Sequence, residues 1–313
     1  ATQATVTGAT STSLTVTVPY GANYQYISVT NLAYNTTGYS GSQFVVTYPS
    51  GGPTSFVTDS SLSSAGANGI ALADFDGNGK PDLAVASSTA VKIFVNMSTS
   101  AGSLSYVLTN TLTVTNNGNE IQVADVDGDG KQDIVIAANT SSASFLRNTT
   151  ASQGSSITFA APVVVSTSNG VTLLSALKLA DLDGDGRPDL VFSGPGGAPS
   201  YVGWVRNTST ANTINFGTVQ SLQVGTDADA IAVADLDKDG KPDIISINYT
   251  SNNISLLHNT SVVGSISFVN VATLNSSSSC RYTVVGDFDG DGNPDIAVAI
   301  SAGSSISLYR NTF

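Results

Sequence analysis

One nine-residue motif with carboxylates at alternate positions occurs five times in the chain, and it constrains the fold more than any other feature. Its first copy is Asp74-Phe-Asp-Gly-Asn-Gly-Lys-Pro-Asp82, and successive copies begin 51 to 56 residues apart. A period of this length, sustained through most of 313 residues, is typical of a repeat protein whose units cannot each bury a core alone. The other copies begin at Asp125, Asp181, Asp235 and Asp287.

The spacing of the oxygen-bearing side chains predicts a calcium-binding loop. Side chains at positions one, three and five point to one centre, the main-chain carbonyl of position seven adds a ligand, and an aspartate at position nine closes the cage. Glycine at position six permits the sharp turn. An EF-hand would need glutamate at position twelve, where the first copy has Val85, so that interpretation fails. The predicted ligands of about five Ca²⁺ ions, one per loop, are Asp74, Asp76, Asn78, Lys80, Asp82, Asp125, Asp127, Asp129, Lys131, Asp133, Asp181, Asp183, Asp185, Arg187, Asp189, Asp235, Asp237, Asp239, Lys241, Asp243, Asp287, Asp289, Asp291, Asn293 and Asp295.

The distribution of acidic residues supports the same prediction. Of 23 Asp and Glu residues, 19 lie at ligand positions, which leaves Asp59, Glu120, Asp227 and Asp229 elsewhere. Several carboxylates within a few ångströms repel one another unless a cation lies among them. Solvated Asp-Gly turns are the alternative, but turns alone need neither the ninth-position aspartate nor fivefold recurrence. The fourth loop is expected to bind most weakly, because Lys238 replaces its glycine.

Composition narrows the class of protein further. Charged residues make up 11% of the chain and the net charge is −12, which argues against nucleic acid as a partner. No apolar run is long enough to span a membrane. Cys280 is the single cysteine, so no intrachain disulfide is possible. Loops of this kind fill with calcium at extracellular concentrations, which favours a secreted or cell-surface location. The sequence begins without a signal peptide, so we expect it to be a processed or trimmed chain.

Each period has the same internal order of elements. An apolar strand precedes the loop, as at Ile70–Ala73, and a second apolar strand follows it, as at Leu83–Ala86; both are expected to be buried on both faces. A third strand ends at an asparagine, and a fourth carries an aromatic residue in four of the copies. Four short strands in about fifty residues predict a β-propeller blade. The repeated asparagines are Asn96, Asn148, Asn207, Asn259 and Asn311, and the aromatic residues are Tyr106, Phe159, Phe216 and Phe268.

The predicted architecture is all-β, with a five-bladed propeller of four-stranded blades over residues 54–313. The last copy stops at Phe313 after its third strand, and Thr54–Val57 matches the missing fourth strand, so this N-terminal strand is expected to close the ring. Residues 1–53 form a separate uncharged region with strands expected at 14–19, 25–34 and 43–48 and a hinge at 49–53. This region is either a partial immunoglobulin-like spacer or an assembly segment that forms a homo-oligomer or filament.

The five loops resemble those of the FG-GAP or VCBS repeat family, which forms the calcium-binding propellers of integrin α-subunit heads and of many secreted bacterial and fungal proteins, some of them lectins. The resemblance covers about residues 55–313, with the form DxDxDGxxD here and Asn78 in place of one aspartate. It implies structural calcium, and adhesion, binding or scaffolding more than catalysis. Integrin heads have seven blades, so five blades are either a compact ring or part of a larger one.

Side chains for catalysis are scarce, and the chain is predicted not to be an enzyme. The single histidine, His258, occupies a position where three other copies have arginine, and Cys280 belongs to a different blade. A propeller hydrolase or lyase would need a central cluster of free carboxylates and histidine. Trp204 is expected to pack in a third strand more than to serve as a sugar platform.

Three functions are candidates for a chain with these features. The first is a secreted adhesion or structural module that binds a protein or glycan at the cell surface; the second is a lectin; the third, an enzyme, is the least supported. Glycosylation sequons are frequent, and the sequence does not decide whether they are occupied. They lie at Asn35, Asn96, Asn139, Asn148, Asn207, Asn248, Asn253, Asn259 and Asn275.

Overall fold

The chain is described by a computed structural model, and its regular structure is entirely β-strand. The described residues are 61–312 except 88, 100–103, 115–117, 139–140, 172, 196–197, 277–278 and 302–304, together with four N-terminal strands. No helix occurs among these residues, and therefore none that is long and apolar enough to cross a membrane. The prediction of an all-β chain is confirmed for this part of the protein.

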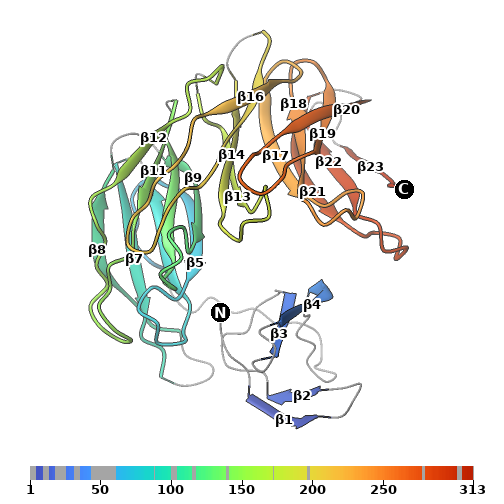
Figure 1. Ribbon diagram of the computed structural model, residues 1–313. Helices are drawn as coiled ribbons and strands as arrows, with labels where there is room; N and C mark the ends of the chain where they lie inside the picture. The colour runs from blue at the N-terminus through green and yellow to red at the C-terminus, as the bar shows by residue number, and fades with distance from the viewer. Residues whose placement is uncertain are drawn as a thin grey trace.

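Five antiparallel sheets follow one another along the chain, and each is called a blade (Figure 1). Blades 1 to 4 have four strands, and blade 5 has three described strands, in chain order within each sheet. The strands of blades 1 and 2 are β5 (Ala67–Ala73), β6 (Asp82–Ser87), β7 (Ala90–Asn96), β8 (Tyr106–Thr113), β9 (Gly118–Ala124), β10 (Asp133–Ala138), β11 (Ser142–Leu146) and β12 (Val163–Ser166). Those of blades 3 to 5 are β13 (Ala176–Ala180), β14 (Asp189–Gly194), β15 (Tyr201–Val205), β16 (Gln220–Gln223), β17 (Ala228–Ala234), β18 (Asp243–Asn248), β19 (Asn253–Asn259), β20 (Phe268–Asn275), β21 (Cys280–Gly286), β22 (Asp295–Ile300) and β23 (Ser305–Tyr309).

The acidic motif forms the connection between the first two strands of every blade. The residue before the motif pairs with the ninth-position aspartate in the same antiparallel register each time, as Ala73 pairs with Asp82 and Ala124 with Asp133. The same pairing recurs at Ala180 with Asp189, Ala234 with Asp243 and Gly286 with Asp295. The predicted order of strand, loop and strand is therefore confirmed in all five copies.

The blades are arranged along an arc, with blades 1 and 5 at its two ends (Figure 1). Consecutive first strands contact one another, from β5 with β9 to β17 with β21, so these strands lie on the inner side. The cores lie between blades. Ile134 and Ile136 of β10 pack in a cluster with blade 1, whereas Val135 and Ala137 of the same strand pack in a cluster with blade 3. The alternation of side chains along one strand thus joins three blades.

Burial of the first strands differs from the sequence-based expectation. Second strands such as β14 and β18 are buried at every residue, as predicted. First strands are only partly buried, and in β5 the residues alternate between exposed and half-buried. The prediction that first strands are buried on both faces is wrong, because each first strand is the edge strand of its blade on the inner side of the arc, and in β5 the face that carries Ile70 and Leu72 is also exposed.

The N-terminal region contributes two hairpins among its described residues. The strand β1 (Thr5–Ala9) pairs with β2 (Leu14–Thr17), and β3 (Tyr26–Asn31) pairs with β4 (Thr36–Gln43). Two of the expected strands overlap β2 and β3, and the strand expected at 43–48 shares only its first residue with β4. Residues 44–48, the hinge at 49–53 and the closing strand Thr54–Val57 lie outside the described residues. The closed five-bladed ring therefore stays a prediction.

Candidate metal centres

Each acidic loop folds around hydrogen bonds between its own main chain and its carboxylates. In the first loop the N–H of Gly79 donates to Oδ2 of Asp74 at 2.7 Å, and the N–H of Asn78 donates to Oδ1 of Asp76 at 3.0 Å. Equivalent bonds recur in the other four loops. The sixth-position glycines have φ between 85° and 88°, a left-handed conformation that side chains with a Cβ disfavour, so the predicted role of this glycine is confirmed.

In the second loop, main-chain N–H groups donate to one oxygen of Asp125, of Asp127 and of Asp129. In the second loop, Oδ1 of Asp125, Oδ2 of Asp127 and Oδ2 of Asp129 are buried and have no hydrogen-bond partner among the described residues. Buried anionic oxygens that accept no hydrogen bond are destabilising unless a nearby cation compensates their charge. Three such oxygens in one loop fit the ligand set of a hard divalent cation such as Ca²⁺.

The ninth-position aspartate links the loop to the rest of the blade. Oδ2 of Asp133 accepts a hydrogen bond from the N–H of Val126, and its Oδ1 accepts one from the N–H of Asn148 at the end of the third strand, at 3.0 and 2.7 Å. All five blades repeat this pair of bonds. An oxygen of Asp133 also lies within 4.8 Å of oxygens of Asp125 and Asp127, so the aspartate borders the candidate site as predicted. The first and third loops bring their first, third and ninth positions together in the same way.

The asparagine that ends each third strand connects two blades. The side-chain amide of Asn207 donates to the carbonyl of Val126, in the loop of the preceding blade, at 2.8 Å, and to the carbonyl of Pro188 in its own loop at 3.0 Å. Asn148, Asn259 and Asn311 likewise donate to the second residue of the preceding loop at 2.7 to 2.9 Å. We call this contact the asparagine clamp. It makes each loop part of an interface between blades.

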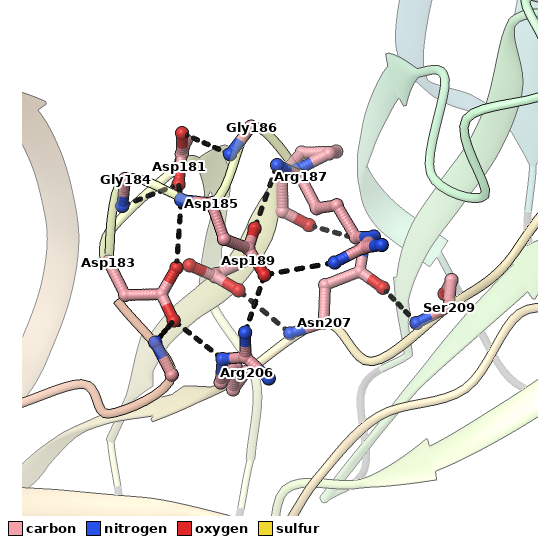
Figure 2. A network of polar contacts seen from close by, with 12 residues as sticks. Asp181, Asp183, Gly184, Asp185, Gly186, Arg187, Asp189, Arg206, Asn207 and Ser209 are labelled. Carbon is pink, nitrogen blue, oxygen red and sulfur yellow. Dashed lines mark hydrogen bonds and ion pairs between the residues drawn. The ribbon is translucent and has the colours of Figure 1, made fainter. Parts of the chain in front are cut away.

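A basic residue beside this asparagine faces the loop of its own blade in four of the five copies. In blade 3, Nε and Nη2 of Arg206 each lie 2.5 Å from a carboxylate oxygen, Oδ2 of Asp183 and Oδ2 of Asp185 (Figure 2). Arg147 in blade 2 lies farther away, at 3.9 and 3.7 Å from the corresponding oxygens of Asp127 and Asp129. His258 and Arg310 occupy the same position in blades 4 and 5, whereas blade 1 has Val95.

This basic position was predicted to be a repeat position, but its role as a counter-charge to the carboxylates was not predicted. The recurrence of Arg or His directly before the repeated asparagine was the available signal. A second difference concerns position seven, for which only the main-chain carbonyl was predicted to take part in the loop. Lys131, Arg187 and Lys241 instead lie 3.1 to 3.7 Å from the fifth-position carboxylate of their own loop.

Burial and charge shift the pKa values of the loop carboxylates in different directions. Burial raises the pKa of Asp133 to about 7, and it raises the pKa of Asp82 and of Asp189 to about 6. Burial also acts to raise the pKa of Asp183, but hydrogen bonds from Arg206 and from the N–H of Gly264 lower it overall. Without a cation, the first three loops therefore contain a ninth-position carboxylate whose ionisation is opposed by its surroundings.

The fourth loop has an unusual backbone at position four. Lys238 adopts a φ of 61° where the other loops have glycine with φ between 72° and 81°. A left-handed conformation is unfavourable for a residue with a Cβ. This feature supports the expectation that the fourth loop binds calcium most weakly, which stays a prediction.

Other residues considered from the sequence have structural surroundings. Trp204 is buried against Phe268, with ring centroids 5.0 Å apart, and donates to Gln220, so its predicted packing role is confirmed. Cys280 is buried and free. The sequon asparagines Asn96, Asn148, Asn207, Asn248 and Asn259 are all buried, which leaves no space for a glycan in the folded chain, whereas Asn275 is exposed. Asn253 is half-buried, and Asn35 and Asn139 lie outside the described residues.

The repeat pattern was compared with known protein families. An FG-GAP-like repeat matches four times, at residues 74–136, 125–192, 181–246 and 235–298. These matches together extend over more than half of the 313 residues. The chain belongs to the FG-GAP-like repeat family. Each match begins at one acidic loop and ends within the strand that follows the next loop, so the FG-GAP-like unit includes the interface between two blades.

This FG-GAP-like chain is similar in fold to one solved structure, and two others match it at lower TM-scores. A lectin from Agrocybe aegerita, described as recognising non-reducing terminal N-acetylglucosamine, has 20% identity and a TM-score of 0.50, with 78% of this chain and 66% of that chain covered. The match thus spans just under two thirds of the lectin. BBS1N in complex with ARL6DN has 13% identity and a TM-score of 0.42, covering 79% of each chain. A chain of humanized Chaetomium thermophilum Polycomb Repressive Complex 2 has 10% identity and a TM-score of 0.42, covering 74% of this chain and 53% of that chain. No curated protein sequence matches the chain.

Proposed function

We propose that the protein is a secreted or cell-surface binding module whose blades are stabilised by calcium and which has no catalytic activity. The observation that carries this proposal is the set of buried oxygens of Asp125, Asp127 and Asp129 that have no hydrogen-bond partner among the described residues. Calcium would neutralise these oxygens and stabilise the loop. Through the ninth-position aspartate and the asparagine clamp, it would also stabilise the interface with the next blade. The ion is then structural, and the exposed loops and turns serve binding.

The absence of catalysis is part of the proposal. His258, the single histidine of the chain, has its Nδ1 3.2 Å from Asp237 and 3.3 Å from Asp243, within the fourth loop. The carboxylates suited to acid–base chemistry are mostly ligand candidates, so they serve the metal in preference to a substrate. A secreted location follows from the calcium requirement, since loops of this kind fill at extracellular calcium concentrations.

Thermal melting of the metal-free chain, with and without added Ca²⁺ or Mg²⁺, tests the proposal. We expect Ca²⁺ to raise the melting temperature markedly and Mg²⁺ to raise it less, because Mg²⁺ demands a more regular octahedral shell. Elemental analysis after dialysis would give the number of bound calcium ions per chain. A melting temperature that does not respond to Ca²⁺ would contradict the proposal.

A lectin is the second candidate, and two observations favour it. The chain shares its fold with the Agrocybe aegerita lectin. A groove also lies between the loops of blades 3 and 4, lined by polar residues including Asp183 and Lys241 and by apolar residues including Val262. Carbohydrates bind through this mixture of hydrogen-bonding and apolar contacts. Screening of the calcium-loaded chain against immobilised glycans would test the candidate, and binding that free sugar does not inhibit would count against it.

A further inference from the structure

The inner strand of blade 1 exposes an apolar surface that the following blades bury. Ile121, Leu177 and Ile231 occupy equivalent positions in blades 2, 3 and 4, and they are 5%, 0% and 4% exposed because each packs against the preceding blade. The corresponding residue of blade 1, Ile70, is 64% exposed, and its neighbour Leu72 is 59% exposed. This surface, defined by Ile70 and Leu72, is called the leading face.

Blade 5 exposes the complementary surface at the other end of the arc. The second residue of each loop inserts into the core of the next blade, so that Phe75 packs 5.8 Å from the ring of Phe159 in blade 2 and is 2% exposed. The equivalent residue of blade 5, Phe288, is 51% exposed. Ile306 and Leu308 of β23 are 71% and 70% exposed on the same blade. We call Phe288, Ile306 and Leu308 the trailing face.

The third strands also carry residues that are buried in the internal blades and exposed in blade 5. The pairing registers place Leu308 opposite Ala297, as Phe145 lies opposite Val135 in blade 2 and Trp204 lies opposite Val191 in blade 3. Phe145 and Trp204 are 0% and 5% exposed because they pack in clusters that include residues of the next blade. Leu308 therefore has the position of a buried interface residue, and no blade among the described residues covers it.

The groups that form the asparagine clamp are also present in blade 1 and in blade 5, at the two ends of the arc. In blades 2 to 5 the asparagine clamp reaches the second residue of the preceding loop, as Asn148 reaches the carbonyl of Phe75 at 2.9 Å. In blade 1 the amide of Asn96 instead donates to the carbonyl of Pro81 and to the hydroxyl of Tyr106, at 3.1 and 3.2 Å. A blade placed on the trailing face would bring such an amide to the carbonyl of Phe288.

We propose that the trailing face of one chain binds the leading face of a second copy, head to tail, so that blade 1 of the second copy follows blade 5 of the first. The two faces are the halves of an interface that occurs between consecutive blades throughout the chain, so the chemistry of the occupant is known. Blades 1 and 5 of one chain lie at opposite ends of the arc (Figure 1), and joining them would require the four internal interfaces to change together. A second copy needs no such change. Because the contact is heterologous, it leads to larger oligomers or to a ring of several copies.

The proposal goes beyond the calcium-stabilised binding module, because neither the metal nor a glycan takes part in the contact. Light scattering after size-exclusion chromatography of the full chain, in saturating Ca²⁺ and over a range of concentrations, tests it. We expect masses that are multiples of 31.8 kDa and that increase with concentration. Ile70→Glu blocks the leading face and Leu308→Glu blocks the trailing face, and each variant alone is expected to be a monomer.

Mixing the two variants gives the decisive result. The intact trailing face of Ile70→Glu and the intact leading face of Leu308→Glu can still meet, so the mixture is expected to form a one-to-one dimer and nothing larger. Val263→Glu is the matched control, since Val263 is 71% exposed in a turn of blade 4 away from both faces, and it is expected to assemble as the wild type does. Melting curves show whether each variant is folded.

Three results would overturn the proposal. A wild-type chain that stays monomeric at all concentrations would favour closure within one chain by Thr54–Val57. Oligomers that persist in both single variants would favour another surface, such as the N-terminal strands. Folded variants that are monomers alone and also in the mixture would exclude a head-to-tail contact. The two proposals can fail separately. If Ca²⁺ does not change the melting temperature but the mixed variants dimerise, the proposed function is refuted and the head-to-tail contact is supported.

Discussion

The side-chain amide of Asn259, at the end of the third strand of blade 4, donates a hydrogen bond of 2.9 Å to the main-chain carbonyl of Leu182 in the loop of blade 3. The same amide donates at 2.9 Å to the carbonyl of Pro242 in the loop of blade 4. One buried side chain therefore connects two candidate metal loops. A change in either loop is expected to affect both blades.

Replacement of Asn259 by Ala should destabilise the folded chain by about 2–3 kcal/mol, because the buried carbonyl of Leu182 loses its partner. The free energy of unfolding in urea, measured with Ca²⁺ present, checks this value. Asn275→Ala is the control, since Asn275 is exposed at the end of β20, and it should change stability by less than about 0.5 kcal/mol. Equal effects of the two substitutions would contradict a special role for the clamp.

Replacement of Asp129 by Ala should remove one calcium ion per chain. Its Oδ2 is one of the three buried oxygens of the second loop that have no hydrogen-bond partner among the described residues, so the remaining ligands would hold the ion too weakly to survive dialysis. Elemental analysis of the dialysed protein measures the loss. Asp229→Asn removes a carboxylate outside the loops and should leave the calcium content unchanged, and a similar loss in both variants would argue against assignment to the second loop.

Replacement of Arg206 by Met should lower the stability of the metal-free chain and increase the stabilisation by Ca²⁺. The guanidinium neutralises Asp183 and Asp185 when no metal is bound, and it repels a cation that enters the third loop. Melting temperatures with and without Ca²⁺ give both effects. Arg281→Met is the control, because Arg281 pairs with Asp229 at 2.8 Å, outside the loops. A calcium response that is unchanged or smaller in Arg206→Met would contradict the prediction.

The metal-free chain should become less stable as the pH rises from about 4 to 7. The folded-state pKa is about 7 for Asp133 and about 6 for Asp82 and Asp189, above the ordinary value of 3.8, so the folded state binds more protons than the unfolded state in this range. The lowered pKa values of Asp183 and Asp295 affect the stability only below this pH range, where these carboxylates become protonated.

Melting temperatures of the metal-free chain at pH 5.0 and 7.5 check the sign of this dependence. Saturating Ca²⁺ should reverse it, because the ion needs ionised ligands and competes with protons at low pH. A metal-free chain that is more stable at pH 7.5 than at pH 5.0 would contradict the prediction.

Glycosylation provides a further prediction. Secretion from a eukaryotic host, followed by mass spectrometry of peptides, should show no glycan at Asn148, Asn207 or Asn259 in the folded protein, because these side chains are buried and donate to main-chain carbonyls. Asn275 is exposed and can accept a glycan. Folded protein with a glycan at one of the three buried positions would contradict the structure at that position.

Local features of the blades were predictable from the sequence because they depend on residues close together in the chain. The positions of the loop strands and the left-handed glycine at Gly79 follow directly from the nine-residue motif. The roles of Asn207 and Arg206 were not predicted. The clamp partner of Asn207, Val126, lies 81 residues away in another blade, and the contact of Arg206 with Asp183 spans 23 residues. The apolar run of β5 also did not reveal which of its faces meets another sheet.

The asparagine clamp also sets an order of events during translation. The partners of the clamp are separated by 73 to 81 residues, and the asparagine always belongs to the later blade. A loop that has left the ribosome therefore lacks its clamp hydrogen bond until the third strand of the following blade has been synthesised. At every stage of synthesis the most recently made blade lacks the clamp hydrogen bond to its loop. The clamps therefore form in order, from the N-terminal blade toward the C-terminal blade.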